Sequence, residues 1–200
     1  MVDEPGRERA DAGRASAPAP SDASEHARLL EAQRQPAMRF ALHLLGDVHD
    51  AEEAVQEAFL KLIQAPGAFR GDSSFRTYVF AAVRNSCLDE RRRRLTKSGH
   101  LREVNPATTD FFQSLPGGSR FAGVSTQVAR RESQEIVRAA IEQLPERQRA
   151  CTVLHDLEGL SYREVGEVLG ITANYVGVLL YQARIRLREI IEEGGIFSAD

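Results

Sequence analysis

Several side chains between residues 158 and 188 could read a nucleic acid. Asn174 can make a bidentate contact to adenine, Gln182 can contact a base or a phosphate, and Arg184 adds positive charge nearby. Such side chains reach base edges when they lie near the N-terminus of a helix that enters the major groove. Nucleic-acid binding is therefore the leading hypothesis for this segment.

The pattern around these residues predicts a helix-turn-helix. Ser161 and Glu164 have the spacing of a capping box, which fixes the start of a first helix. Gly170 can adopt the left-handed conformation that ends this helix, and Thr172 can cap a second one. Apolar residues of the second helix recur at helical spacing and predict a buried stripe of Val176, Leu179, Leu180, Ala183 and Leu187. An ordinary helical hairpin is the alternative interpretation.

The composition predicts a soluble, cytoplasmic protein. Hydrophobic residues make up 42% of the chain and charged residues 28%, a typical balance for globular domains. We expect no signal peptide in residues 1–24 and no membrane-spanning segment. The cysteines, Cys87 and Cys151, lie in separate segments and predict reduced thiols, and the histidines lack ligand spacing, so neither a metal nor a cofactor is expected. The absence of a Gly-rich phosphate loop and of Ser/His/Asp spacing argues against an enzyme.

The net charge of −3 conceals two oppositely charged segments. Asp47 to Ala58 contains five acids and no lysine or arginine, whereas Arg84 to Arg102 contains seven lysines and arginines against two acids. The two segments are expected to bind opposite partners. A solvated helix face for the first, and a helix end that favours cations for the second, would explain the same charges without a partner.

We expect an all-α chain of two small helical domains joined by a flexible linker, with the helix-turn-helix in the second domain. The residues from 96 to about 128 lose helical periodicity, and this stretch is too long for a loop inside one compact domain. The predicted division is a disordered leader over 1–24, a first domain over 25–97, a linker over 98–128, a second domain over 129–193 and a tail over 194–200.

Three helices are expected in the first domain. One runs to Gly46 and is either kinked at Pro36 or split there into two short helices. The next begins near Val48 to Asp50 and leaves its acidic face available to a partner, while it buries a stripe of Ala51, Val55, Ala58, Phe59 and Leu62. The last runs from about Ser74 to Arg94, after a polar loop.

Several motifs, in order and spacing, resemble the extracytoplasmic-function sigma factors of bacterial RNA polymerase. They are Asp50-Ala-Glu-Glu-Ala-Val-Gln-Glu-Ala-Phe-Leu-Lys-Leu-Ile, Phe69-Arg-Gly-Asp-Ser-Ser-Phe-Arg-Thr-Tyr, Leu144-Pro-Glu-Arg-Gln-Arg and Leu157-Glu-Gly-Leu-Ser-Tyr-Arg-Glu-Val. The resemblance covers residues 28–97 and 130–190. It implies a first domain, region 2, that binds core polymerase and opens the promoter at the minus-ten element. A second domain, region 4, would read the minus-thirty-five element.

The resemblance also implies three sets of site residues. The set that docks on the largest polymerase subunit is Asp50, Glu53, Gln56, Glu57 and Phe59. The set for the minus-ten element captures a flipped base and holds phosphates, and it comprises Phe69, Arg70, Asp72, Ser73, Ser74, Phe75, Tyr78, Arg84, Asn85, Arg91, Arg92, Arg93 and Arg94. The set for the minus-thirty-five element is Ser161, Tyr162, Arg163, Thr172, Asn174, Tyr175, Val178, Gln182 and Arg184.

The chain departs from the family pattern at two places. Tyr78 stands where the family usually has tryptophan. In the second helix of the helix-turn-helix, the usual basic and polar residues are replaced by Gly177, Val178, Leu179 and Tyr181-Gln182, which reduces the charge available for phosphates. A glycine inside a helix costs about 1 kcal/mol relative to alanine, so Gly177 indicates close approach of DNA or of another helix.

The function implied is that of a sigma factor that directs core RNA polymerase to specific promoters and helps to melt them. The implied partners are core RNA polymerase, promoter DNA and an anti-sigma factor, with no insertion into a membrane. Two alternatives remain open at this point. One is a stand-alone helix-turn-helix regulator that binds an operator as a dimer, and the other is a sigma-like adaptor that binds an anti-sigma protein without reading DNA.

Overall fold

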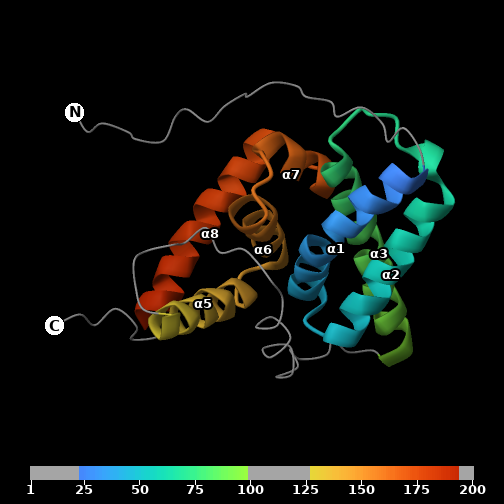
Figure 1. Ribbon diagram of the computed structural model, residues 1–200. Coiled ribbons are helices and arrows are strands. Elements are labelled where there is room, and N and C mark those ends of the chain that lie inside the picture. The colour runs from blue at the N-terminus through green and yellow to red at the C-terminus, as the bar shows by residue number, and fades with distance from the viewer. Residues whose placement is uncertain (1–22, 99–126, 194–200) are drawn as a thin grey trace, which may run out of the picture.

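The computed structural model describes residues 23–98 and 127–193, which fold into helices (Figure 1). The N-terminal helices are α1 (Ala23–Leu45), α2 (Val48–Gln64) and α3 (Phe75–Ser98), with a short 3-10 turn η1 (Pro66–Ala68) before α3. The C-terminal helices are α5 (Gln127–Glu142), α6 (Glu146–Thr152), α7 (Tyr162–Leu169) and α8 (Ala173–Glu193), with a π turn η2 (Val153–Leu157) after α6. These ranges contain no strand, so the all-α prediction is confirmed. The predicted tail, and most of the predicted leader and linker, lie outside the described residues.

α1 is one helix across Pro36, which is one of the two predicted outcomes, because Ala37, Phe40 and Ala41 beyond it are fully buried and their packing outweighs the hydrogen bond that proline removes. Two helix boundaries differ from those predicted. α1 begins at Ala23, inside the predicted leader. α3 continues past Arg94 to Ser98, with Thr96 donating from its hydroxyl to the Arg92 carbonyl at 2.9 Å.

Gly46 and Asp47 together fix the turn between α1 and α2. Gly46 has a φ of 69° and donates its N–H to the Leu42 carbonyl at 2.8 Å, which ends α1. Asp47 then caps α2 by accepting from the N–H groups of His49 at 3.0 Å and Asp50 at 3.2 Å. As the cap of α2, Asp47 is buried, so its carboxylate does not belong to the acidic face that the charge pattern suggested.

The N-terminal and C-terminal helices pack directly against one another. α1 contacts α6, and α3 contacts α7, where the two groups of helices meet in the centre of Figure 1. Buried apolar residues from both groups form one continuous cluster, with Phe40 and Phe80 edge to face at 5.5 Å on the N-terminal side. The sequence predicts two domains joined by a linker. In the structure these two halves are in direct contact, which we call the closed arrangement.

The two cysteines are free, as predicted, and both are buried. Burial raises the pKa of the Cys87 thiol to about 12 and that of the Cys151 thiol to about 11, which keeps both protonated. Within the described ranges, no helix combines the length and hydropathy that crossing a membrane requires.

His43 is a buried histidine on α1 that faces the C-terminal helices. Its burial, together with the positive charges of Arg149 on α6, Arg138 on α5 and Arg39 on α1, lowers its pKa from 6.5 to about 3. The folded protein therefore holds His43 neutral at physiological pH.

We expect acid to destabilise the fold through His43. Below pH 6.5 the unfolded chain takes up a proton on this residue, whereas the folded chain does so only near pH 3, so stability falls as the pH drops through that window. The loss is about 1.4 kcal/mol for each pH unit. Urea unfolding at about pH 7.5 and about pH 5.5 measures it. His43→Gln should show a smaller loss than the wild type, and an equal loss would assign the effect to other groups.

Candidate polymerase and nucleic-acid interfaces

The helix-turn-helix forms as predicted. The Ser161 hydroxyl accepts from the Glu164 N–H at 3.3 Å, and the Glu164 carboxylate accepts from the Ser161 N–H at 2.9 Å, which completes the capping box. Gly170 ends α7 with a φ of 67°, and Thr172 accepts from the Tyr175 N–H at 3.3 Å at the start of α8. In the predicted apolar stripe Val176, Leu179, Leu180 and Ala183 are buried, and Leu187 is partly buried against them.

The outward face of α8 is polar at its start and apolar further along. Asn174, Tyr175, Val178 and Gln182 are all exposed, as the stripe requires. Tyr181 is 68% exposed and Ile185 41%, and these two residues extend an apolar strip that the sequence did not single out. The face can thus offer Asn174 and Gln182 to bases, but it carries no lysine or arginine between Ala173 and Gln182.

The polar side chains around this face already form contacts with neighbouring polar groups. Gln182 accepts from Gln148 at 3.3 Å, and Arg184 donates to Asp156 at 3.1 Å. Arg163 is 62% exposed and pairs with Glu167 at 3.3 Å along α7. Each of these contacts is at the surface, so DNA phosphates can compete for the same donors.

Two glycines allow α7 and α8 to approach closely. A Cβ on Gly177 would lie 3.4 Å from the Tyr162 ring, so the close approach that the sequence indicated involves the first helix of the motif. The space at Gly166 is tighter, because a Cβ there would lie 2.6 Å from the Ile171 carbonyl oxygen in the turn. Sequence reasoning missed Gly166, although a glycine in the middle of the first helix was the available signal.

Gly166→Ala is therefore expected to destabilise the protein by roughly 1–3 kcal/mol, because backbone in the turn must move to admit the methyl group. Chemical denaturation followed by circular dichroism measures the loss. Gly67→Ala is the matched control: its Cβ would meet nothing within 4 Å, so the same substitution should be neutral or slightly stabilising there. Equal stabilities of the two variants would show that the turn tolerates the extra carbon.

α2 presents a mixed polar and apolar face to solvent. Glu53 and Gln56 of the predicted docking set are exposed, and Phe59 is half-buried against the core. Leu60 and Ile63 are 50% and 56% exposed and follow Glu53 and Gln56 along the same side of the helix. The sequence-based prediction did not include these two residues because it was based on the buried stripe and the charges of the helix. Helical spacing alone would have found them. We call Glu53, Gln56, Leu60 and Ile63 the outer face of α2.

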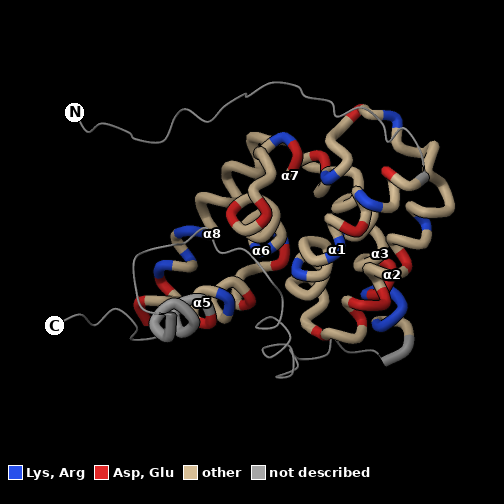
Figure 2. The backbone as a smooth tube through the Cα atoms, viewed as in Figure 1, with Lys and Arg blue, Asp and Glu red and all other residues tan. Residues whose placement is uncertain are grey.

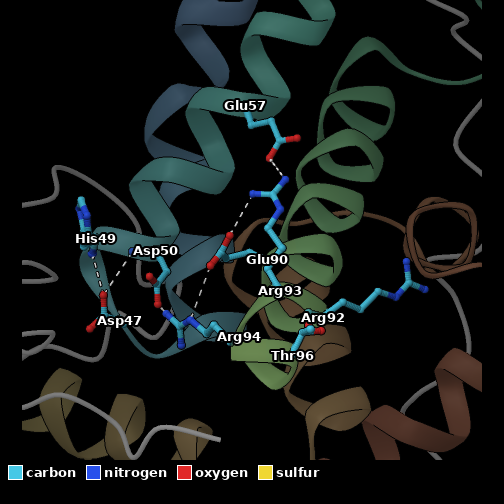
Figure 3. A network of polar contacts seen from close by, with 9 residues as sticks. All are labelled: Asp47, His49, Asp50, Glu57, Glu90, Arg92, Arg93, Arg94 and Thr96. Atoms are coloured by element: carbon cyan, nitrogen blue, oxygen red, sulfur yellow. Dashed lines mark hydrogen bonds and ion pairs between the residues drawn. The ribbon is translucent and has the colours of Figure 1, made fainter. Parts of the chain in front are cut away.

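The remaining predicted acids of α2 pair with the basic end of α3 (Figure 3). Glu57 accepts from Arg93 at 2.8 Å and from Lys61 at 2.9 Å, and hydrogen bonds from Lys61 and Arg93 hold the pKa of its carboxyl below the usual value. Asp50 pairs with Arg94. The tube view shows acidic and basic positions gathered where α2 meets α3 (Figure 2). The two charged segments therefore bind each other in this structure, an arrangement that the sequence reading did not anticipate.

Glu90 contributes a third acid to the same network. It is buried, and it accepts from Arg93 at 3.1 Å and lies 3.9 Å from the Nε of Arg94. Arg92 differs from these two arginines, since its side chain is 76% exposed and pairs only along its own helix with Asp89 at 3.2 Å. Of the four consecutive arginines, Arg92 is the one best placed to meet a phosphate.

The loop before α3 is built on buried aromatic rings. Phe69 and Phe75 lie edge to face at 5.3 Å, both are buried, and the half-buried Tyr78 contacts both rings. Ser74 begins α3 by accepting from the Thr77 N–H at 3.1 Å. Between and beyond these anchors, Arg70, Asp72 and Asn85 are exposed, while Ser73 and Arg84 are half-buried. We therefore expect Phe69 and Phe75 to hold the loop in shape and the polar residues to contact a ligand.

Comparison with known families places both halves of the chain. Residues 29–96 match the model of Sigma-70 region 2, and residues 134–187 match that of Sigma-70, region 4. The sigma-H factor of Pseudomonas aeruginosa is 34% identical over 143 residues, which cover 68% of this chain and 72% of that protein. The sigma-E factor of Escherichia coli K12 is 32% identical over 142 residues, which cover 70% and 71%. The Mycobacterium tuberculosis SigG is 32% identical over 203 residues, and the match spans 95% of this chain but about half, 52%, of that longer protein.

Solved structures share the fold. The sigma factor RpoE of Bartonella quintana, in complex with the anti-sigma factor NepR, superposes with a TM-score of 0.61 at 21% identity and covers 84% of this chain and 95% of its own. CnrH, in complex with the cytosolic domain of CnrY, gives 0.59 at 19% identity, over 88% and 92%. With both sigma-70 regions present in order, the chain belongs to the sigma-70 family and, by its relatives, to the extracytoplasmic-function sigma factors.

Proposed function

We propose that this chain binds core RNA polymerase, directs it to specific promoters and helps to melt the minus-ten element. The proposal is carried by the order of three surfaces along one chain: the outer face of α2, the polar loop before α3, and the helix-turn-helix of α7 and α8. The role is one of binding and positioning, and polymerase supplies the chemistry.

Each surface has a separate part in this proposal. The outer face of α2, with Glu53 and Gln56, docks on the polymerase. The polar groups of the loop, together with Asn85, hold a flipped base. Flipping costs a few kcal/mol of lost base stacking, and these new contacts offset that cost. Asn174 at the start of α8 reads upstream bases, and phosphate contacts come mainly from α3.

An anti-sigma factor is the further partner that we propose. One structural neighbour, RpoE of Bartonella quintana, was solved with the anti-sigma factor NepR bound, and the other, CnrH, with the cytosolic domain of CnrY. The exposed apolar residues of α2 and α8 offer surfaces that such a protein can cover. Because a promoter-specificity subunit acts together with polymerase on DNA, we propose a cytoplasmic location for the chain.

Reconstitution with core polymerase tests the proposal. Purified chain should co-elute with core polymerase in size-exclusion chromatography and should enable run-off transcription from promoters found by sequencing the bound DNA. A helix-turn-helix regulator would bind DNA without core polymerase and would not support transcription. An adaptor would bind an anti-sigma protein and show neither activity.

A further inference from the structure

Four exposed side chains of α8 lie on one straight line along the helix. Asn174, Val178, Tyr181 and Ile185 follow one another at intervals of four, three and four residues, so they share one side of the helix. All four are exposed, and Val178 is 48% exposed. This side is opposite the buried stripe with which α8 packs on α5, α6 and α7. We call Val178, Tyr181 and Ile185 the apolar strip of α8.

Asn174 occupies the end of this line that lies at the start of the helix. It is the second residue of α8, in the turn that Thr172 caps by accepting from the Tyr175 N–H at 3.3 Å. The first turns of a recognition helix are the part that reaches base edges in the major groove. Val178 follows one turn later, about 6 Å along the helix axis. Two base-pair steps of about 3.4 Å each cover a similar distance. A groove that brings Asn174 to one base pair therefore brings Val178 to a base pair about two steps away.

Val178 can recognise only an apolar group, because its side chain neither donates nor accepts a hydrogen bond. In the major groove the C5 methyl group of thymine is the apolar group that a base pair presents. Opposite a G·C pair, the valine would keep water from polar base atoms and return no hydrogen bond, which is unfavourable. Opposite thymine, the valine and the C5 methyl group shield each other from water, which is favourable. Both effects select thymine.

The neighbourhood of Val178 favours DNA over a protein as the occupant of this position. Exposed apolar side chains in a row can also bind a protein. However, the line begins with Asn174, whose amide can pair with adenine, so the apolar strip continues a surface that is suited to base edges. No lysine or arginine lies between Ala173 and Gln182, so no cation on these turns directs the contact to a phosphate instead. The strip is also open to solvent in the closed arrangement.

We propose that Val178 reads the C5 methyl group of a thymine in the upstream promoter element, about two base pairs from the adenine that Asn174 reads. The inference rests on the proposed function and deepens it, because it names the chemical group that α8 selects. An apolar contact then provides sequence discrimination on a helix face that carries little charge.

Deoxyuridine tests this contact, because it differs from thymidine only by the missing C5 methyl group. Promoter fragments are found by sequencing the DNA bound to the wild-type chain with core polymerase, and each upstream thymine is replaced by uracil in turn. At one position the affinity of the holoenzyme should fall about fourfold, which corresponds to about 0.8 kcal/mol for one buried methyl group. This position should lie about two base pairs from the adenine whose recognition is lost in Asn174→Ala.

Val178→Ala should remove the dependence on the methyl group, so that its holoenzyme binds thymine and uracil promoters with nearly equal affinity. The variant should fold normally, because Val178 is exposed and alanine favours a helix, and circular dichroism checks this. Ile185→Ala is the matched control. Ile185 belongs to the same strip but lies about 16 Å beyond Asn174 along the helix, so the fourfold ratio of about 0.8 kcal/mol should persist in this variant.

5-Methylcytosine supplies a test in which binding is gained. Replacing the recognised T·A pair by C·G should weaken binding of the wild-type holoenzyme. A methyl group on C5 of that cytosine restores the apolar group in the groove, and it should recover about fourfold in affinity for the wild type. Val178→Ala should show no such recovery.

Three results would overturn the proposal. The first is an upstream element in which no single uracil lowers the affinity. The second is an undiminished uracil effect in Val178→Ala. The third is an equal loss of affinity on thymine and uracil promoters in Val178→Ala, which would assign the strip to a protein contact.

Failure of the wild-type holoenzyme to support transcription would count against the proposed function alone. The uracil comparison is then made with the full chain by itself, on duplexes that it selects from a random pool. A selected duplex with the expected uracil effect would support the reading of thymine by Val178, and failure to select any duplex would overturn it.

Discussion

Replacing Glu52 and Glu53 by lysine is expected to weaken the binding of core RNA polymerase by about 100-fold, while the fold stays intact. Both side chains are exposed on α2, and Glu53 belongs to the outer face that we assign to the polymerase. Reversal of charge replaces an attraction by a repulsion, and like charges brought together across an interface cost several kcal/mol. Exposed substitutions away from special features change stability by only about 0.5 kcal/mol. Titration of labelled core polymerase measures the affinity.

Glu57 is deliberately left unchanged in this test. Its carboxylate binds Arg93 and Lys61, so its reversal would disturb the pairing of α2 with α3 as well as any contact with polymerase. Glu31→Lys provides the control, since Glu31 is 71% exposed on α1 and pairs only with Arg34 on the same helix. An unchanged affinity in the double variant, or an equal loss in Glu31→Lys, would show that the docking surface lies elsewhere.

Local signals in the sequence predicted the helix-turn-helix correctly. A capping box, a left-handed glycine and a second cap act within a few residues, so Ser161, Gly170 and Thr172 could be placed without knowing what surrounds them. At Pro36 local signals could not decide between one kinked helix and two short helices, and the structure has one helix. The effect of Pro36 on α1 is overridden by the burial of Phe40 and Ala41, which depends on helices far away in sequence.

The charged site residues were harder to predict, because sequence does not tell which faces meet. Composition correctly separated an acidic from a basic segment, but it could not show that Asp50 would pair with Arg94 or Glu57 with Arg93. Glu158 illustrates the same limit. It belongs to a recognisable motif, yet its burial between Arg39 and Arg76 follows from the packing of two halves that the sequence reading had treated as independent domains.

The ion pairs between α2 and α3 determine which arginines are available to bind DNA phosphates. Arg94 is 19% exposed and is held by Asp50 and Glu90, so it stabilises the α2 and α3 pair. Arg92 is largely exposed, and Arg84 lies about two and a half helical turns beyond the end of the loop, on the same helix. Of the basic residues first expected to hold phosphates, Arg84 and Arg92 are therefore the ones we assign to that role.

Replacing Arg84 and Arg92 together by glutamine should lower the salt slope of promoter binding by holoenzyme by about 1.8, or about 0.9 for each lost phosphate contact. The measurement is the affinity for a promoter fragment between about 50 and about 200 mM salt. Arg94→Gln is the matched control, because it removes one charge from the same helix but from a site already neutralised by acids. Arg94→Gln should lower stability and leave the slope nearly unchanged.

Asn174→Ala should have the complementary effect, because Asn174 is exposed at the start of α8, where it can meet a base edge, and carries no charge. The salt slope should stay the same, while discrimination among upstream sequences should fall by roughly 1–3 kcal/mol, the value of one bidentate base contact. A competition between promoter variants that differ only upstream measures this loss. A retained slope in the double arginine variant, or an equal loss of affinity on all sequences in Asn174→Ala, would contradict the division in which α3 positions the DNA and α8 reads it.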